Sequence, residues 1–189
     1  MNPALTLHQI SKSFGAVHAL HGVDVAVAAG SVHALLGENG AGKSTLMHVA
    51  YGMLAADSGR ILVHGSPVAI RSPRDARRLG IGMVHQHFAS VASMTVAENV
   101  ELAMGRRGMG NGEWGISGVG LELDPQARVE DLSVAMKQRL EIVKALATGA
   151  KILLLDEPTA VLAPPEIEEL LPMLRRFADA GGAVVLITH

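Results

Sequence analysis

A glycine-rich stretch at residues 37–45 has the composition needed to bind phosphate groups. It reads GENGAGKST, which fits the pattern G-x-x-x-x-G-K-[ST]. The glycines let the backbone curl so that successive N–H groups point at phosphate oxygens. A lysine in this pattern adds a mobile cation for the β- and γ-phosphates, and the following hydroxyl can be placed on Mg²⁺. The residues predicted to contact the phosphates and the metal are Gly37, Asn39, Gly40, Ala41, Gly42, Lys43, Ser44 and Thr45.

Two adjacent carboxylates, Asp156 and Glu157, follow an apolar run at residues 152–155. At the edge of a parallel sheet they would face the crevice that holds the phosphate loop, as we call residues 37–45. Asp156 is placed to bind magnesium through Ser44 or a water molecule. Glu157 is placed to orient or deprotonate a water near the γ-phosphate. Alternatively, Asp156 and Glu157 could be a surface acidic pair without a role in catalysis. The presence of a phosphate loop in the same chain makes this alternative less favourable.

The phosphate loop requires a strand before it and a helix after it. Residues 32–36 predict the strand, and a helix is predicted to begin at about Lys43, where its dipole would add to the positive field. Further apolar runs at 81–84, 152–155 and 183–187 are separated by helical patterns. Strand–helix–strand alternation of this kind indicates an α/β fold with a parallel core sheet.

The N-terminal part predicts antiparallel strands instead. Residues 5–7 and 23–27 alternate with period two, and a hairpin is predicted around His64 and Gly65, between 61–63 and 68–70. A short helix is predicted after Ser72 and Pro73, which suit its cap and first turn.

Residues from about 86 to 135 differ from the rest of the chain. Thr95 and Glu98 form a predicted capping box at the start of a helix. Residues 106–120 are rich in glycine and without periodicity, which predicts a mobile loop. We interpret this region as a mostly helical insertion between two strands of the core sheet.

A helix predicted from about residue 165 to 179 contains Pro172. A proline in a helix interior removes one backbone hydrogen bond, at a cost of about 3 kcal/mol. The sequence therefore predicts a kink or break near residues 168–172.

Composition excludes several classes of function. The 189-residue chain has a net charge of −2, which gives no support for a nucleic-acid-binding surface. It has no cysteine, which excludes disulfides, thiolate zinc sites and a cysteine nucleophile and fits a reducing cytoplasm. The first residues show no signal-peptide pattern, and the apolar run at 183–187 is far too short to span a bilayer.

The ordered motifs resemble the nucleotide-binding domain of ATP-binding cassette (ABC) ATPases, and the resemblance covers the whole chain. The phosphate loop is one of the family's motifs. Phe14 matches the family's aromatic ring that stacks on adenine, and Gln86 matches the glutamine that contacts magnesium and senses the membrane subunit. Residues 132–136 match the L-S-G-G-Q signature, and His189 matches the switch histidine. Asp156 and Glu157 match the Walker B aspartate and the catalytic glutamate.

This resemblance implies a P-loop NTPase fold with a parallel core sheet, an N-terminal antiparallel β subdomain and a helical insertion subdomain. Residues 1–189 would form one domain truncated at its C-terminus, with the core in 1–85 and 150–189 and the glutamine loop, helical subdomain and signature helix in 86–149. It implies ATP and Mg²⁺ as cofactors. The implied catalytic residues are Glu157, His189 and Gln86, and the implied metal-binding residues are Ser44, Gln86 and Asp156.

A finer similarity to bacterial importers of simple sugars and nucleosides lies in residues 81–88, 95–99 and 138–146. Those importers usually fuse two cassettes in one chain, and this chain resembles the first, cut at the switch histidine. The implied function is ATP hydrolysis that powers solute import through transmembrane permease subunits, at the cytoplasmic face of the inner membrane. An extracytoplasmic solute-binding protein would take part indirectly, and no nucleic acid is expected.

In this family two cassettes pair head to tail, so that the signature of one closes over ATP held by the other. Ser133 and the first N–H groups of the helix from about Val134 would then contact the partner's γ-phosphate. The segment from Gln86 to about Met104 would touch the permease.

Two departures from the family pattern qualify this reading. Ala135 replaces the second glycine of the signature; it costs about 1–2 kcal/mol if that position needs a positive φ, and it is harmless in a helix. Ala163 replaces the D-loop aspartate, so communication between paired sites would be altered. Two other functions remain open: a soluble ABC ATPase of translation or DNA repair, and a weakly hydrolysing regulatory nucleotide-binding module.

Some patterns have plainer explanations. Phe14 could be a core aromatic residue, and Arg74, Arg77 and Arg78 could form a solvated helix face or a basic patch. Residues 110–115 match G-x-G-x-x-G, but the sequence predicts no strand before them, so a dinucleotide site is not expected.

Overall fold

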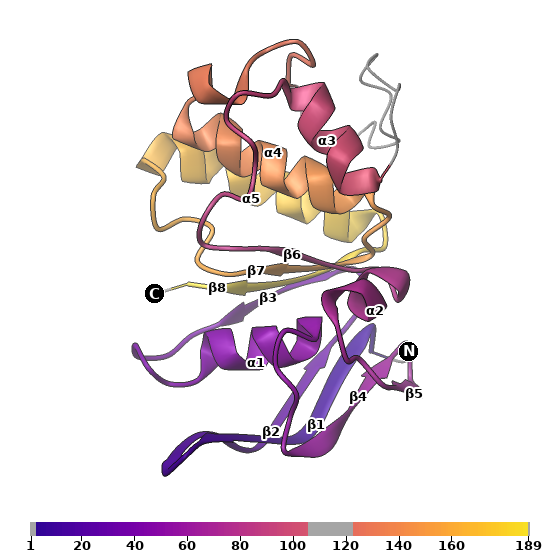
Figure 1. Ribbon diagram of the computed structural model, residues 1–189. Coiled ribbons are helices and arrows are strands. Elements are labelled where there is room, and N and C mark those ends of the chain that lie inside the picture. Colours follow the sequence, from indigo (N-terminus) through magenta and orange to yellow (C-terminus); the bar gives the residue numbers. More distant parts are fainter. Residues whose placement is uncertain (1–2, 106–122, 189) are drawn as a thin grey trace.

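The computed structural model of the chain describes residues 3–105 and 123–188, and it contains two four-stranded sheets (Figure 1). The first sheet is antiparallel, with the order β2 (Val17–Val27), β1 (Leu5–Phe14), β4 (Ser58–Val63) and β5 (Ser66–Val68). The second sheet is parallel, with the order β3 (Ser31–Leu35), β8 (Ala183–Ile187), β7 (Ile152–Leu155) and β6 (Ile81–Val84).

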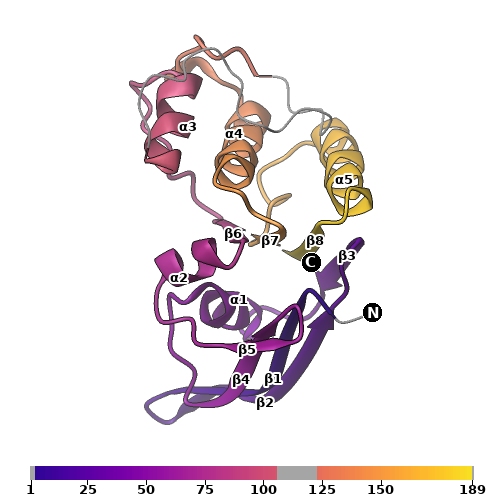
Figure 2. The same ribbon diagram turned by 90° about the vertical axis from the view of Figure 1, so that its right-hand side faces the viewer.

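The helices form two layers around the parallel sheet. Figures 1 and 2 show α1 (Lys43–Tyr51) between the two sheets, with the short α2 (Pro73–Arg78) beside it. The opposite face is covered by α4 (Val134–Ala147) and α5 (Pro164–Asp179), and α3 (Val96–Met104) packs on α4. A 3₁₀ turn at Val129–Asp131 precedes α4. Within the described ranges, no helix has the length and apolar character needed to cross a membrane.

The core is divided by the parallel sheet. Ile152 and Leu154 face a cluster built with α1 and the antiparallel sheet, whereas Leu153 and Leu155 face a cluster built with α3, α4 and α5. A strand buried on both faces must be apolar at every position. This requirement explains the uninterrupted apolar runs in the sequence, and it confirms the predicted parallel core.

The antiparallel strands are longer than the sequence predicts. The predicted strands at 5–7 and 23–27 are only parts of β1 and β2, because register shifts along this pair interrupt the two-residue alternation. The predicted hairpin is confirmed: β4 and β5 are joined by His64 and Gly65, both with positive φ, although β5 lies at Ser66–Val68 and not at 68–70.

The helical insertion between β6 and β7 is also confirmed. The Thr95 hydroxyl accepts a hydrogen bond from the Glu98 N–H at 3.2 Å, and the Glu98 carboxylate accepts one from the Thr95 N–H at 2.7 Å, which completes the capping box. The helix after Ser72 begins at Pro73 as predicted, with Ser72 as its N-cap. The predicted loop at 106–120 lies outside the described residues.

The predicted break near Pro172 is wrong, because α5 runs without interruption from Pro164 to Asp179. Pro172 and Glu168, whose carbonyl lacks its helical donor, both lie on the exposed side, where water can satisfy that carbonyl. The opposite side packs on β3 and β8. Packing of its buried residues offsets the lost hydrogen bond, and these are Leu170, Met173, Leu174, Phe177 and Ala178.

Candidate phosphate-binding and catalytic site

The candidate site lies at the edge where the parallel strands end. Figure 1 shows the carboxyl ends of β3, β7 and β8 on the same side as the N-terminal ends of α1, α4 and α5. Every strand end at this edge is followed by a segment predicted to be functional. The edge therefore brings together residues that are far apart in the sequence, as expected for a ligand site in a parallel α/β sheet.

The phosphate loop connects β3 to α1, as predicted. Gly42 directly precedes α1 with a φ of 88°, a left-handed conformation that favours glycine. A Cβ atom at this position would lie 2.4 Å from the carbonyl oxygen of Ala19 and 2.9 Å from the Leu20 side chain, both on β2. The antiparallel sheet thus supports the loop from behind, a contact that the pattern alone does not reveal.

Lys43 lies against its own loop. Its ammonium group donates hydrogen bonds to the carbonyl oxygens of Gly37 at 2.6 Å and Glu38 at 2.9 Å. This places a positive charge beside the first N–H groups of α1, which carry the positive end of the helix dipole. Asn39, Gly40 and Ala41 form the exposed tip of the loop, and Thr45 is a partly buried residue in the first turn of α1.

Ser44 and Asp156 meet directly. The Ser44 hydroxyl donates a hydrogen bond to Asp156 Oδ1 at 3.0 Å, and Asp156 is only 7% exposed. The Asp156 N–H continues the sheet by donating to the Val84 carbonyl at 3.0 Å, which fixes the carboxylate at the end of β7. A hydroxyl and a carboxylate are hard oxygen ligands, and Mg²⁺ is usually bound by one or two protein groups together with substrate phosphates. These two side chains fit a Mg²⁺ site.

Gln86 and Glu157 form a second pair at the same edge. The Gln86 side-chain amide donates a hydrogen bond to Glu157 Oε2 at 3.2 Å. Glu157 has a φ of 50°, which is uncommon for a residue other than glycine. The structure thus brings the residues after β6 and after β7 together beside Ser44 and Asp156.

The other predicted site residues are further from this cluster. Phe14 is 48% exposed at the end of β1, with the Lys12 ammonium 5.6 Å from its ring centroid, so the core-aromatic explanation is wrong. Its partner in the sheet register is Val17, close to the β2 residues that support the loop. Ser133 caps α4 by accepting a hydrogen bond from the Met136 N–H at 3.2 Å. His189 lies outside the described residues.

The structure resolves what the two alanine departures do to the backbone. Ala135 is the second residue of α4 and is not among the described non-glycine residues with positive φ, so alanine brings no strain there. Ala163 precedes α5 and offers no side-chain cap. Only half of a capping box remains, in which Glu166 accepts a hydrogen bond from the Ala163 N–H at 2.8 Å.

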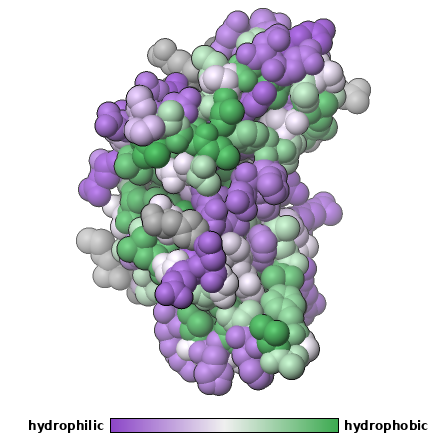
Figure 3. Space-filling model, turned by 90° about the vertical axis from the view of Figure 1, so that its left-hand side faces the viewer, coloured by the Kyte–Doolittle hydropathy of each residue, from purple (hydrophilic) through white to green (hydrophobic). Residues whose placement is uncertain are grey.

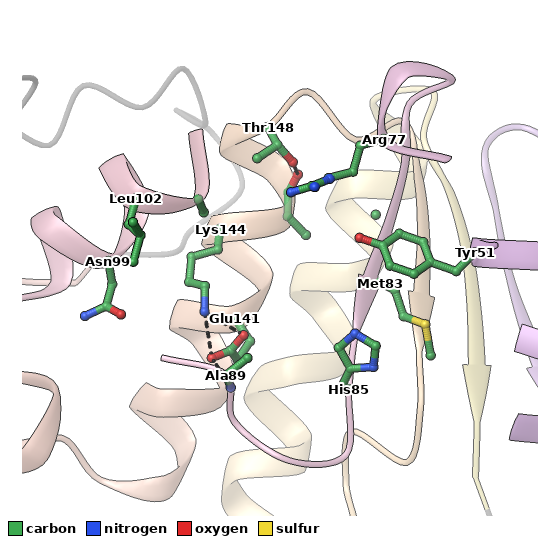
Figure 4. Close-up of a pocket in the computed structure, with 13 residues that line it drawn as sticks. Tyr51, Arg77, Met83, His85, Ala89, Asn99, Leu102, Glu141, Lys144 and Thr148 are labelled. Atoms are coloured by element: carbon green, nitrogen blue, oxygen red, sulfur yellow. Dashed lines mark hydrogen bonds and ion pairs between the residues drawn. The ribbon is translucent and has the colours of Figure 1, made fainter. Parts of the chain in front are cut away.

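Sequence reasoning missed His48 and a cavity lined by Tyr51 and His85. His48 Nε2 lies 4.0 Å from Asp156 Oδ2, and its i,i+4 spacing from Ser44 on α1 was the available signal. The Tyr51 and His85 rings pack edge to face at 6.1 Å and line a cavity of about 270 Å³ between the core and the helical insertion (Figure 4). Burial, with a smaller contribution from His48, lowers the pKa of His85 below its ordinary value.

A second, wider hollow of about 770 Å³ adjoins this cavity, and the two share Arg77, Leu102, Ala103 and Thr148. Arg74, Arg77 and Arg78 of α2 line one side of it, and the ends of α3 and α4 line the other. The arginines therefore give a positive wall to the groove between the core and the helical insertion.

The fold and the site define a nucleotide-binding cassette of the P-loop type. A solved structure of an ATP-binding cassette of an ABC transporter superimposes with a TM-score of 0.87 at 27% sequence identity, covering 100% of this chain and 82% of that one. The family model for the ABC transporter matches residues 20–160. The chain therefore belongs to the ABC transporter family.

Two relatives place it more finely. It is 45% identical over 198 residues to the ribose import ATP-binding protein RbsA 1 of Rubrobacter xylanophilus, covering 100% of this chain and 40% of the relative. It is 45% identical over 194 residues to the guanosine import ATP-binding protein NupO of Bacillus subtilis, covering 98% of this chain and 38% of the relative. The chain thus spans about 40% of the length of these relatives.

Proposed function

We propose that this chain is an ATP-binding cassette that binds ATP with Mg²⁺ and hydrolyses it to power import of a small solute. The observation that carries the proposal is the 3.0 Å hydrogen bond between Ser44 and Asp156. It joins the phosphate loop to the carboxylate pair, so that phosphates and magnesium have their ligands in one place. The import function of the 45% identical relatives supports the second half of the proposal.

Each predicted residue has a role in this proposal. The N–H groups of the phosphate loop and Lys43 bind the phosphates, while Phe14 stacks on adenine. Ser44, Asp156 and Gln86 hold Mg²⁺, which when bound neutralises charge on the phosphates. Glu157 orients a water molecule and accepts its proton, and the Gln86 amide fixes the Glu157 carboxylate. His189 is assigned the switch-histidine role by the family motif alone.

A second cassette completes the site. Exposed apolar side chains belong to segments at this edge: Leu36 (72% exposed) follows β3, Val161 (54%) follows β7, and Val134 and Met136 begin α4. Figure 3 looks onto this face, where hydrophobic residues lie in several groups among hydrophilic ones. Apolar surface of this kind supports a protein interface. Ser133 and the first N–H groups of α4 would then contact ATP held by the other cassette.

The permease subunits dock at the groove between the core and the helical insertion. The segment from Gln86 to about Met104 lines this groove through Ala89, Asn99 and Leu102. We place the chain at the cytoplasmic face of the inner membrane, with an extracytoplasmic solute-binding protein delivering a simple sugar or nucleoside. Residues 1–189 form one cassette, in which 86–149 carry the glutamine loop, the helical subdomain and the signature helix. Contact of the segment from Gln86 to about Met104 with the permease reports the nucleotide state.

Magnesium-dependent ATP binding by the full-length chain tests the proposal. Asp156→Asn should weaken binding of ATP in the presence of Mg²⁺ by about tenfold or more and leave metal-free ATP binding unchanged. Asp131→Asn, at an exposed position away from the site, is the matched control. Equal Mg²⁺ dependence in Asp156→Asn and wild type would refute the proposed site.

Ala163 supports a second candidate function, a regulatory module with little turnover. It leaves α5 without a side-chain cap at the position where the family's D-loop carries an aspartate. This candidate predicts normal ATP binding without appreciable hydrolysis in the assembled transporter, so a turnover measurement separates the two.

A further inference from the structure

A buried ion pair lies on α4, away from the phosphate loop. Glu141 is 8% exposed, and its Oε2 accepts a hydrogen bond from the Lys144 ammonium at 2.9 Å, one helical turn away. Burying two charges is costly unless further hydrogen bonds satisfy them. Figure 4 shows this pair on one side of the cavity, facing the backbone of Ala89.

The further hydrogen bonds come from the chain that follows Gln86. Glu141 Oε1 accepts from the Ala89 N–H at 3.1 Å, from the Ser90 hydroxyl at 2.7 Å and from Lys144 at 3.0 Å. Lys144 also donates to the Ser90 hydroxyl oxygen at 2.9 Å. Two charged side chains of α4 thus hold two consecutive residues of another segment.

This clamp connects two parts of the proposed mechanism. Gln86, three residues before Ala89, donates to Glu157 beside the chain's own nucleotide. Ser133 caps the N-terminus of α4, about 12 Å from Glu141 along the helix axis. A helix transmits displacement as a rigid element, so a shift at Gln86 is carried to the first turn of α4, which faces the partner's nucleotide.

We propose that Glu141 is a positioning residue that clamps residues 89–90 to α4, so that Gln86 and the first turn of α4 move together. The inference rests on the proposed function, since it assigns Glu141 to the coupling between two ATP sites. It gives the buried pair a role that neither phosphate binding nor proton transfer requires.

The test uses the full-length chain assembled with its membrane subunits. Ser90→Ala removes the bridging hydroxyl and leaves the Glu141–Lys144 pair intact, so the fold should be retained. We expect unchanged ATP binding, a roughly two- to thirtyfold lower kcat for ATP hydrolysis and a Hill coefficient that falls towards one. Glu141→Ala should show a larger loss, which Glu141→Gln partly rescues because its amide oxygen still accepts the Ala89 N–H.

Ser66→Ala is the matched control, since it makes the same change at an exposed position of β5, outside the segment proposed to dock the permease. Hydrogen exchange of the Ala89 amide, measured on the same variants, should accelerate in Ser90→Ala and not in Ser66→Ala. Unchanged cooperativity and unchanged Ala89 exchange in Ser90→Ala would overturn the inference, as would an equal loss in Ser66→Ala. Absence of ATP hydrolysis in the wild type would contradict the proposed function instead, and the exchange comparison would still decide the inference.

Discussion

At the scale of residues, the site depends on a few contacts between side chains that follow different strands. Ser44 contacts Asp156, and Gln86 contacts Glu157. The motifs predicted that these residues act together. They could not reveal that Gly42 lies against β2, because that contact joins the loop to a strand whose pairing is irregular.

Gly42 should be more sensitive to substitution than Gly40, although both have left-handed backbone conformations. Gly42→Ala adds a clash with the Ala19 carbonyl oxygen to the left-handed strain, whereas a Cβ atom at Gly40 meets open space. We expect Gly40→Ala to lower the free energy of unfolding by about 1–2 kcal/mol and Gly42→Ala by more, with loss of ATP binding. Urea unfolding and equilibrium ATP binding measure both effects, and equal costs at the two positions would contradict the proposed support by β2.

His85 should make stability depend on pH. Because its pKa is lowered in the folded state, the unfolded chain binds more protons at mildly acidic pH. The contribution of neutral His85 to the free energy of unfolding is complete above the pKa of about 6.5 that histidine has in the unfolded chain. This contribution is lost as the pH falls towards the pKa of His85 in the folded state. His85→Gln should therefore flatten the decline in the free energy of unfolding as the pH falls below about 7. His21→Gln, at an exposed position, is the matched control. An unchanged pH profile in His85→Gln would refute this.

At the scale of elements, the apolar patterns predicted type and order better than length. The buried strands β6, β7 and β8 were recognisable because apolar residues fill every position of each, apart from Gly82. The lengths of β1 and β2 could not be recognised, because apolar and polar residues do not alternate regularly in their exposed polar stretches. The helix break predicted near Pro172 was wrong for a related reason. The local sequence shows the lost hydrogen bond that proline causes, but it does not show the tertiary packing of α5 that offsets this loss.

Pro172→Ala should stabilise α5. The alanine N–H restores the hydrogen bond to the exposed Glu168 carbonyl, and we expect a gain of about 2 kcal/mol in the free energy of unfolding, somewhat reduced because the unfolded chain gains freedom. Pro165→Ala, in the first turn where proline is tolerated, is the control and should give no gain. Equal unfolding midpoints for Pro172→Ala and wild type in urea would show that the proline costs nothing here.

At the scale of the whole molecule, the cassette consists of a core that holds the phosphate loop and a helical insertion that carries Ser133. The groove between them contains the Glu141–Lys144 pair and borders the arginines of α2. Sequence motifs predicted the two halves and their chemistry. They did not predict the groove, because its lining residues come from segments far apart in the sequence, and only the tertiary fold brings these segments together.

ATP turnover by the full-length chain, assembled with its membrane subunits, is the measurement that decides whether Glu157 is the catalytic base. Glu157→Gln keeps the size of the side chain but cannot accept the proton of the attacking water, whereas Glu168→Gln makes the same change on the exposed side of α5. We expect Glu157→Gln to lower kcat by about 100-fold or more with ATP binding retained, and Glu168→Gln to leave kcat unchanged. Wild-type turnover in Glu157→Gln would contradict this role of Glu157.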